Sequence, residues 1–322
     1  MVAPRVILKA LNNTIFMPLK NKVTIIGAGN VGSTTAYSLI ASDITEEIAL
    51  IDLNDAMVKA QVMDLQHSVP FWGYTNVKVG TYKDIKDSKV VIITCGAKQQ
   101  PGETRLDLVK KNATIIKDIV PKVFAQNKNA ILVMVTNPVD VLTYLAVKMF
   151  PKKKNQIFGS GTILDSARFR LLLGQKLNIN PRSIHAYIVG EHGDSELPLW
   201  SSATIGNASL KNFRIPEKDK KIIFEQAKNA AYAIIEGKQS TYFAIAAGLE
   251  DIVKAVMYNQ NTVLPLSHLI EGQFGIKNVA LSLPVVVGAD GICQSLDYDI
   301  SAAEKKQLQA SAKQLQKVIA GL

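Results

Sequence analysis

A glycine-rich turn near the N-terminal end limits the folds open to this chain more than any other feature. The segment from Gly27 to Gly32 has the spacing G-x-G-x-x-G, follows an apolar run at Val23–Ile26 and leads into a helical pattern over Val31–Ala41. In such a turn the first glycine permits a sharp bend, the second lets backbone approach a pyrophosphate, and the third lets helix pack closely on strand. The order of strand, glycine turn and helix predicts a dinucleotide-binding unit, with the phosphates at the helix N-terminus.

An acidic residue follows the next predicted strand at the spacing that such a unit uses. Asp52 lies at the end of the strand Ile48–Ile51, twenty residues beyond Gly32. A carboxylate at this point accepts hydrogen bonds from the ribose hydroxyls and repels a 2′-phosphate, and no arginine follows Asp52 to bind one. The sequence therefore favours NAD over NADP. A site for FAD or another nucleotide remains the alternative.

Strand-sized apolar runs alternate with helical patterns up to about residue 160. The runs Val90–Thr94 and Ile131–Thr136 are apolar throughout, which is typical of parallel strands covered on both faces. We expect an α/β fold with a doubly wound parallel sheet, a Rossmann domain, over residues 22–160. A mixed α+β substrate domain is expected over residues 161–322, and residues 1–21 form an N-terminal extension of unknown role. In the second domain the patterns predict helices over 164–177, 217–235, 241–259 and 301–320, and strands over 184–189 and 279–287.

Composition excludes several classes of protein. No apolar run approaches the ~20 residues that a membrane span needs. Two cysteines, Cys95 and Cys293, are too few for a disulfide framework or a zinc site, so we expect no metal and a reducing, cytoplasmic compartment. The net charge of +10 comes mostly from scattered lysine, because only six of the 37 basic residues are arginine. Such scattering favours a solvated surface over a nucleic-acid interface.

His192 lies where a strand end would present a catalytic side chain. Reduction of a small 2-oxo acid needs a cation for the carboxylate, a donor that polarises the ketone, and an acid that titrates near neutral pH. Arginine suits the first role and histidine the last. Of the four histidines, only His192 lies in a polar, glycine-flanked segment just after a predicted strand. The alternative is a structural histidine.

Asp165 and Arg168 lie three residues apart on a predicted helix and share one face. They form either an ordinary ion pair or a functional one, in which Arg168 binds the substrate carboxylate and Asp165 holds the imidazole of His192 in one tautomer. A further segment, Gly96–Arg105, follows a strand end and has glycines on both sides of a polar stretch. It predicts either a mobile lid that brings Arg105 onto the reacting carbonyl or a plain connecting loop.

From about Lys22 to its C-terminal end, the chain resembles the lactate/malate dehydrogenase family. The motifs that carry the resemblance are Gly27–Gly32, Asp52, Gly96–Arg105, Val135–Pro138, Asp165–Arg168 and Gly190–Asp194, in the family's order. The resemblance implies an NAD-dependent oxidoreductase that acts on the CH-OH group of a 2-hydroxy acid.

The resemblance also implies individual roles. His192 is the proton donor and acceptor, Asp165 its partner, Arg168 the carboxylate anchor and Arg105 the polariser of the carbonyl. Further contacts are implied at Asn137 with substrate and cofactor, at Thr241 with substrate, and at Val31, Tyr82, Gly96, Ala97 and Ser160 with the cofactor.

One lid residue separates substrates within this family. It lies six positions before the catalytic arginine and is Gln99 here. Malate dehydrogenases have an arginine there, which pairs the second carboxylate of oxaloacetate. A neutral glutamine leaves that carboxylate unpaired, at a cost on the order of several kcal/mol. Pyruvate and L-lactate are therefore the implied substrates, in glycolysis or fermentation, with malate or another 2-hydroxy acid as the alternative. A structural protein that binds NAD without turnover is the rival of another class, and the full set of four catalytic residues argues against it.

Arg170 and His185 suggest regulation. Arg170 is two residues from Arg168, so on a helix it faces away from the substrate. In bacterial members of the family that fructose 1,6-bisphosphate activates, an arginine and a histidine at the matching positions bind the effector's phosphates across a subunit interface. The resemblance implies an allosteric homotetramer of this type. A surface arginine and a structural histidine are the alternative.

Overall fold

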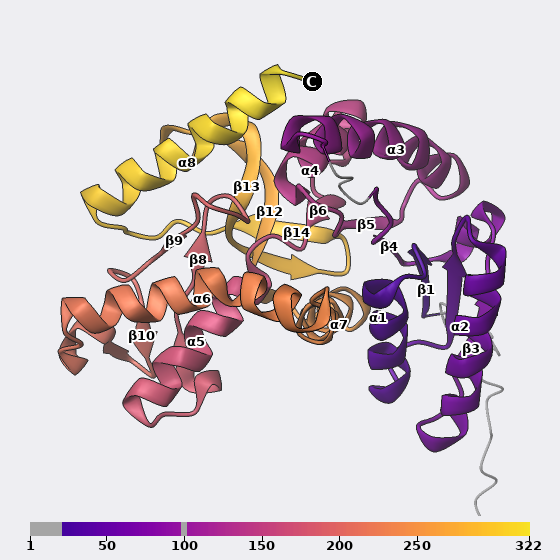
Figure 1. The fold of residues 1–322 in the computed structure, drawn as a ribbon, viewed down its shortest axis with the longest axis horizontal. Coiled ribbons are helices and arrows are strands. Elements are labelled where there is room, and N and C mark those ends of the chain that lie inside the picture. Colours follow the sequence, from indigo (N-terminus) through magenta and orange to yellow (C-terminus); the bar gives the residue numbers. More distant parts are fainter. Residues whose placement is uncertain (1–20, 98–101) are drawn as a thin grey trace, which may run out of the picture.

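The computed structural model describes residues 21–97 and 102–322, except for the side chain of Arg105. In these ranges a nine-stranded sheet runs through the molecule in the order β14-β13-β12-β6-β5-β4-β1-β2-β3 (Figure 1). The strands from β6 to β3 are parallel to one another. Their bounds are β1 Lys22–Ile26, β2 Glu47–Ile51, β3 Asn76–Val79, β4 Val90–Ile93, β5 Ile131–Met134 and β6 Ile157–Gly159. The predicted doubly wound fold is confirmed.

The parallel strands are apolar throughout because both faces of the sheet are covered. In β4, Val90 and Ile92 pack into one core with α1 (Asn30–Ala41) and α2 (Asp55–Ser68). Val91 and Ile93 pack into a second core with α3 (Arg105–Gln126) and α4 (Val139–Met149). All four side chains are fully buried. Since successive strand residues point to opposite faces, a two-sided sheet requires a continuous apolar run.

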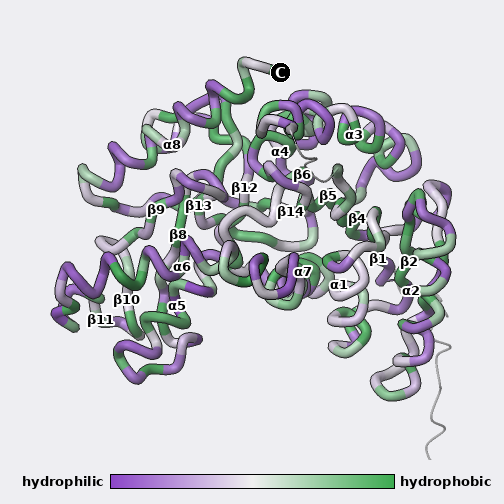
Figure 2. Tube along the Cα trace, in the orientation of Figure 1, coloured by the Kyte–Doolittle hydropathy of each residue, from purple (hydrophilic) through white to green (hydrophobic). Residues whose placement is uncertain are grey.

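The second half of the chain extends the same sheet. β12 (Thr262–Glu271), β13 (Lys277–Gly288) and β14 (Gly291–Ser295) are antiparallel, and β12 joins β6 through the pair Ser267 and Gly159. The helices of this half are α5 Ile163–Leu177, α6 Glu217–Lys238, α7 Phe243–Met257 and α8 Ala302–Ala320. Figure 2 shows hydrophobic and hydrophilic segments alternating along the outer helices α6 and α8, as expected where one helix face is buried.

The strand predicted over residues 184–189 is interrupted. β7 (Ile184–His185) pairs with β10 (Thr204–Ile205), whereas β8 (Ile188–Val189) pairs with β9 (Leu197–Pro198) in a separate sheet. The apolar pattern continues across the break because Ala186 is buried in the same core as its neighbours. β8 leads directly into the segment that holds His192.

No helix in residues 21–97 and 102–322 is long and apolar enough to cross a membrane.

Candidate functional site

The glycine turn after β1 is shaped by close contacts at two positions and open space at the third. Gly27 has φ +111°, and a Cβ on Gly32 would lie 1.9 Å from the carbonyl oxygen of Gly27. Both positions therefore require glycine. A Cβ on Gly29 would meet no atom within 4 Å. The absence of a side chain at Gly29 therefore leaves room for a ligand.

The start of α1 fits the phosphates of a dinucleotide. Gly29 is its N-cap and supplies no side-chain hydrogen bond, so the first N–H groups of the helix are uncapped. Asp52, at the end of β2, accepts hydrogen bonds from the backbone N–H groups of Ala28 (2.8 Å) and Asn54 (2.9 Å). Its carboxylate thus lies beside the turn, where a ribose would follow the phosphates. These residues fit NAD.

A buried amide that sequence analysis missed connects two predicted segments. Asn112, on α3, is 2% exposed. Its Oδ1 accepts from the backbone N–H of Ala97 (2.7 Å), and its Nδ2 donates to the carbonyl oxygen of Asn137 (2.8 Å). Asn112 thus connects Ala97, which lies just after β4, with Asn137, the residue predicted to contact both substrate and cofactor. Only burial marks it, since asparagine on a predicted helix carries no signal of its own.

Three other predicted cofactor residues follow the carboxyl ends of parallel strands, as the glycine turn does. Val31 is half-buried in the first turn of α1, and Ser160 is buried just after β6. Tyr82 begins the 3₁₀ helix Tyr82–Asp87 and packs against the core beneath α3.

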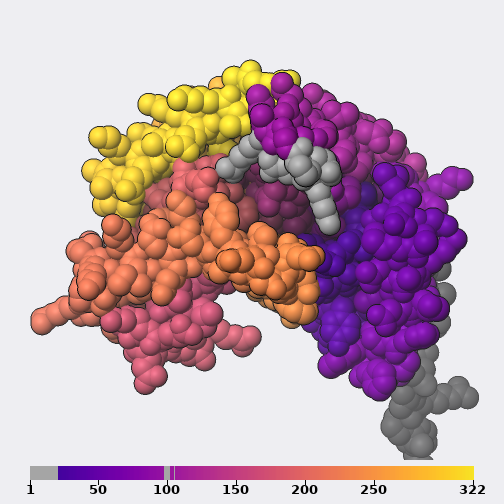
Figure 3. All heavy atoms as spheres, in the orientation of Figure 1, coloured from indigo at the N-terminus to yellow at the C-terminus, as the bar shows by residue number. Residues whose placement is uncertain are grey.

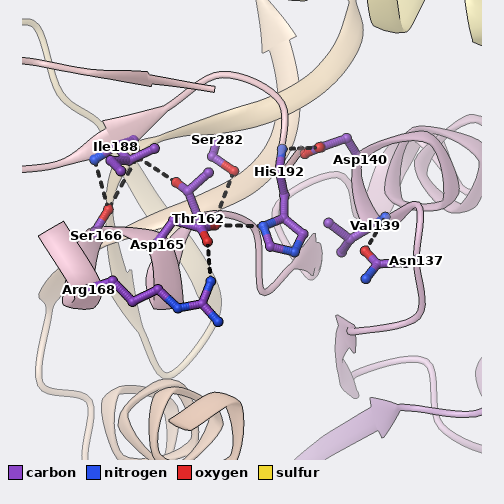
Figure 4. Close-up of polar contacts among 10 residues, drawn as sticks. All are labelled: Asn137, Val139, Asp140, Thr162, Asp165, Ser166, Arg168, Ile188, His192 and Ser282. Carbon is purple, nitrogen blue, oxygen red and sulfur yellow. Dashed lines mark hydrogen bonds and ion pairs between the residues drawn. The ribbon is translucent and has the colours of Figure 1, made fainter. Parts of the chain in front are cut away.

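The structure brings together His192, Asp165 and Arg168. His192 Nδ1 lies 2.6 Å from Asp165 Oδ2, and Arg168 Nη1 lies 3.0 Å from Asp165 Oδ1. The Asp165 side chain is 3% exposed, that of Arg168 12% and that of His192 28%. Figure 4 shows the second ring nitrogen of His192 turned away from Asp165, toward the side where Asn137 lies. One ring nitrogen is therefore held by a buried carboxylate and the other faces the open part of the site.

Three elements hold this cluster in place. Thr162 and Ser166 of the α5 region bind the backbone of Ile188, with Thr162 Oγ1 donating to its carbonyl oxygen at 2.6 Å and Ser166 Oγ accepting from its N–H at 3.0 Å. α5 therefore docks directly on β8. The backbone N–H of His192 donates to Asp140 Oδ2 of α4 at 2.7 Å. The acid, its partner and the arginine thus come from a loop and a helix that are fixed to each other.

The charges favour a protonated imidazole. Burial by itself lowers the pKa of His192, but the Asp165 carboxylate, with help from Asp140 and Glu196, outweighs it and raises that pKa to about 9. Burial works against ionisation of Asp165 as well, yet His192 and Arg168 hold its pKa below the usual range. At neutral pH the pair is an imidazolium beside a carboxylate, which can give a proton to a reacting oxygen.

The remaining predicted residues have different surroundings. Gln99 lies outside the described residues, and for Arg105 only the backbone, at the start of α3, is described. Thr241 is half-buried in the loop before α7, and its neighbour Ser240 accepts a hydrogen bond from Asn30 Nδ2 at 3.0 Å. This contact joins the loop to the glycine turn. Figure 3 shows the surface hollowed next to the orange α6–α7 segment.

The predicted effector residues lie on neighbouring elements. Arg170 is half-buried on α5, and His185 is exposed on β7, which packs against α5.

Comparisons with known proteins agree with this geometry. Residues 21–159 match the family model "lactate/malate dehydrogenase, NAD binding domain", and residues 162–321 match "lactate/malate dehydrogenase, alpha/beta C-terminal domain". The chain is 47% identical over 305 residues to the L-lactate dehydrogenase of Thermoanaerobacter sp. (strain X514), covering 93% of this chain and 98% of that protein. It is 44% identical over 304 residues to that of Acetivibrio thermocellus, covering 92% and 96%.

Solved structures are similarly close. The minor L-lactate dehydrogenase of Enterococcus mundtii superposes with a TM-score of 0.91 at 38% identity, covering 94% of this chain and 99% of that chain. A lactate dehydrogenase from a Medee basin deep-sea metagenome library superposes with the same TM-score at 37% identity and the same coverage.

Proposed function

The chain belongs to the lactate/malate dehydrogenase family, and from this premise we propose that His192, Asp165 and Arg168 perform its reaction. That reaction is the NAD-dependent interconversion of pyruvate and L-lactate. The observation that carries the proposal is the chain of contacts from Arg168 through Asp165 to His192, at 3.0 Å and 2.6 Å.

His192 acts as the acid and base. In pyruvate reduction the protonated imidazole donates from its second ring nitrogen to the ketone oxygen, and in lactate oxidation the neutral ring takes the hydroxyl proton. Asp165 accepts from the first ring nitrogen, which fixes the tautomer and stabilises the imidazolium. Arg168 binds the substrate carboxylate with a guanidinium that Asp165 already orients.

When bound, NAD supplies and accepts the hydride. We propose that the uncapped start of α1, with Gly27, Gly29 and Gly32, holds its pyrophosphate and that Asp52 binds the adenosine ribose. Further cofactor contacts are proposed at Val31, Tyr82, Gly96, Ala97, Asn137 and Ser160. The domain division proposed at residues 160 and 161 is supported by the two family models, one of which ends at residue 159 and the other of which begins at residue 162.

Substrate choice is assigned to four residues. Arg105 polarises the reacting carbonyl, and Asn137 and Thr241 contact the substrate. Gln99, which is neutral, opposes the methyl group of pyruvate and leaves a second carboxylate unpaired, so malate is not the favoured alternative.

A comparison of two acids and one variant tests the proposal. Pyruvate should have the higher kcat/KM, with oxaloacetate turned over poorly, when NADH oxidation is followed by absorbance. His192→Ala should lose about 10²–10⁴-fold in turnover while binding NADH nearly as well in a fluorescence titration. Near-normal turnover by this variant would remove His192 from the mechanism.

A homotetramer is proposed for the assembly. Large apolar side chains around α2 are exposed, which suits burial against another subunit: Leu53, Met63, Phe71, Trp72 and Tyr74. Light scattering should give about four times the 35.1 kDa of one chain. A particle of single-chain mass would contradict it.

We also propose activation by fructose 1,6-bisphosphate through Arg170 and His185. The two lie on the adjacent elements α5 and β7, and α5 also presents Arg168. Millimolar effector should lower the half-saturating pyruvate concentration of the wild type, and Arg170→Gln should abolish this response. Superimposable wild-type curves would exclude the effector.

A cytoplasmic location is proposed on the chemistry of the two cysteines. Cys95 and Cys293 are both free thiols, which suits a reducing compartment. Cell fractionation with an activity assay tests it.

A further inference from the structure

A third carboxyl group lies against the catalytic pair. Glu196, the residue before β9, is 7% exposed, and within the described part of the chain its Oε1 is fully buried without a hydrogen-bond partner. One ligand atom each from Glu196, Asp165 and His192 lie within 4.8 Å of one another. Such spacing could suit a cation, but the guanidinium of Arg168 already pairs with Asp165. Glu196 therefore faces the proton-transfer site itself.

The charged groups that act most strongly on Glu196 come from three parts of the chain. α5 contributes Asp165 and Arg168, the catalytic loop contributes His192, and α6 contributes Lys228, whose Nζ donates to the carbonyl oxygen of Asp194 at 2.7 Å. Burial first, and then the charge of Asp165, raise the pKa of Glu196 to about 8. Glu196 is thus neutral at neutral pH and becomes an anion on mild alkalinisation.

Glu196 also borders a second opening. A cavity of about 390 Å³ between α6 and α8 is lined by Glu196, Trp200, Phe224 and Gln307, and none of the proposed substrate or cofactor residues lines it. Glu304 lies across this cavity, where Ser201 and Ser301 bind its carboxylate and hold its pKa below the usual range, against the effect of burial. Glu196 therefore lies between the proton-transfer site and a second cavity.

The position costs stability. A buried carboxyl oxygen without a partner carries a desolvation penalty, and an apolar side chain of similar size would remove it. Groups of this kind occur preferentially where a perturbed proton affinity serves catalysis. The location beside Asp165 and His192 supplies that reason here.

We propose that Glu196 is a positioning residue for proton transfer, whose ionised form keeps the proton on His192 in mildly alkaline solution. The inference rests on the proposed role of His192. When Glu196 ionises, it adds a negative charge near the imidazolium, in addition to those of Asp165 and Asp140. His192 therefore loses its proton only at a higher pH. As a result, pyruvate reduction continues at a pH where it would fall if Asp165 acted on His192 without Glu196.

Glu196→Gln tests this, because it keeps the size and removes the charge. Pyruvate kcat/KM falls as pH rises through the pKa of His192, and lactate kcat/KM rises through the same pKa. In the variant, the fall of pyruvate kcat/KM and the rise of lactate kcat/KM, the two limbs of the pH profiles, should both move to lower pH by at least ~1 unit. At a fixed pH above the pyruvate limb this is about a tenfold loss of pyruvate kcat/KM. Near and below neutral pH the variant and wild type should agree, since Glu196 is then uncharged. A merely structural role would not move both limbs equally.

Two further variants keep the test decisive. Glu225→Gln, an exposed site on α6, changes net charge equally and should leave both limbs in place. Glu196→Ala should shift the limbs as Glu196→Gln does. If one of these two variants folds poorly, the other still tests the proposal. Unshifted limbs in a folded Glu196 variant would overturn the inference, provided that the wild type shows both limbs. A wild type without a pyruvate limb would overturn the proposed function of His192 instead.

Discussion

Replacing Asp165 with asparagine separates two contributions to catalysis that the structure combines in one side chain. Asp165→Asn keeps the shape but only one of the two oxygens that now accept from Nδ1 of His192 at 2.6 Å and from Nη1 of Arg168 at 3.0 Å. It removes the charge that keeps the imidazole protonated. The size and shape of the side chain are thus retained, while its charge and one acceptor oxygen are lost.

The expected loss follows from the pKa of His192. At about 9, this pKa leaves roughly 99% of the imidazole protonated at pH 7. Without the carboxylate, burial dominates and the pKa falls to about 6.5 or lower, so at most about a quarter stays protonated. This accounts for at least about a fourfold loss of pyruvate kcat/KM. Loss of electrostatic stabilisation of the imidazolium brings the total toward 10²–10⁴-fold.

The assay is pyruvate kcat/KM as a function of pH, with NADH affinity from fluorescence. The alkaline limb should move down by at least ~2 pH units, acidification should recover only part of the lost rate, and NADH affinity should change little. Asp118→Asn, an exposed change on α3, serves as the control. An unmoved limb would refute the reasoning, because the charge of Asp165 would then not hold the proton on His192.

Three other outcomes are expected. Gly32→Ala should destabilise the fold, since its Cβ would lie 1.9 Å from the oxygen of Gly27, whereas Gly29→Ala, with no atom within 4 Å, should melt normally but bind NADH weakly. Thermal unfolding beside NADH titration checks both. Asp84, whose pKa is held at about 2 by lysine and backbone contacts that outweigh burial, adds stability above its ordinary pKa of about 4 that is lost as pH falls through about 2. Asp84→Asn should therefore flatten the acid dependence of the unfolding free energy over that window. Gln99→Arg should raise oxaloacetate kcat/KM relative to pyruvate, and an unchanged ratio would show that this residue does not face the substrate.

Elements with a strong local pattern could be predicted closely. The helix predicted over 301–320 is α8, Ala302–Ala320, because Ser301 and Glu304 form a capping box that marks its start. The strand predicted at Val23–Ile26 is β1, extended by one residue. The single strand predicted over 184–189 was wrong, because its two halves pair with different partners and no local pattern encodes that choice.

The site divides in the same way. Motif order marked His192, Asp165 and Arg168. In the fold His192 and Arg168 both contact Asp165, while the catalytic roles of the three residues stay predictions. Asn112 and Glu196 carried no signal, since one is an ordinary helix residue and the other follows the catalytic motif as one more acidic side chain.

Local chemistry along the chain thus determined the glycine turn, the acidic end of β2, the apolar strands and the residue types suited to bind and protonate a 2-oxo acid. Periodicity and short motifs depend only on neighbours in sequence, so they can be recognised from the sequence alone. Tertiary structure alone decided that β12 continues the sheet at β6, that Asn112 connects Ala97 with Asn137, and that Glu196 loses its water beside His192. Burial and through-space charge set these properties, because the proton affinity of a carboxyl depends on what surrounds it rather than on what precedes it in the chain.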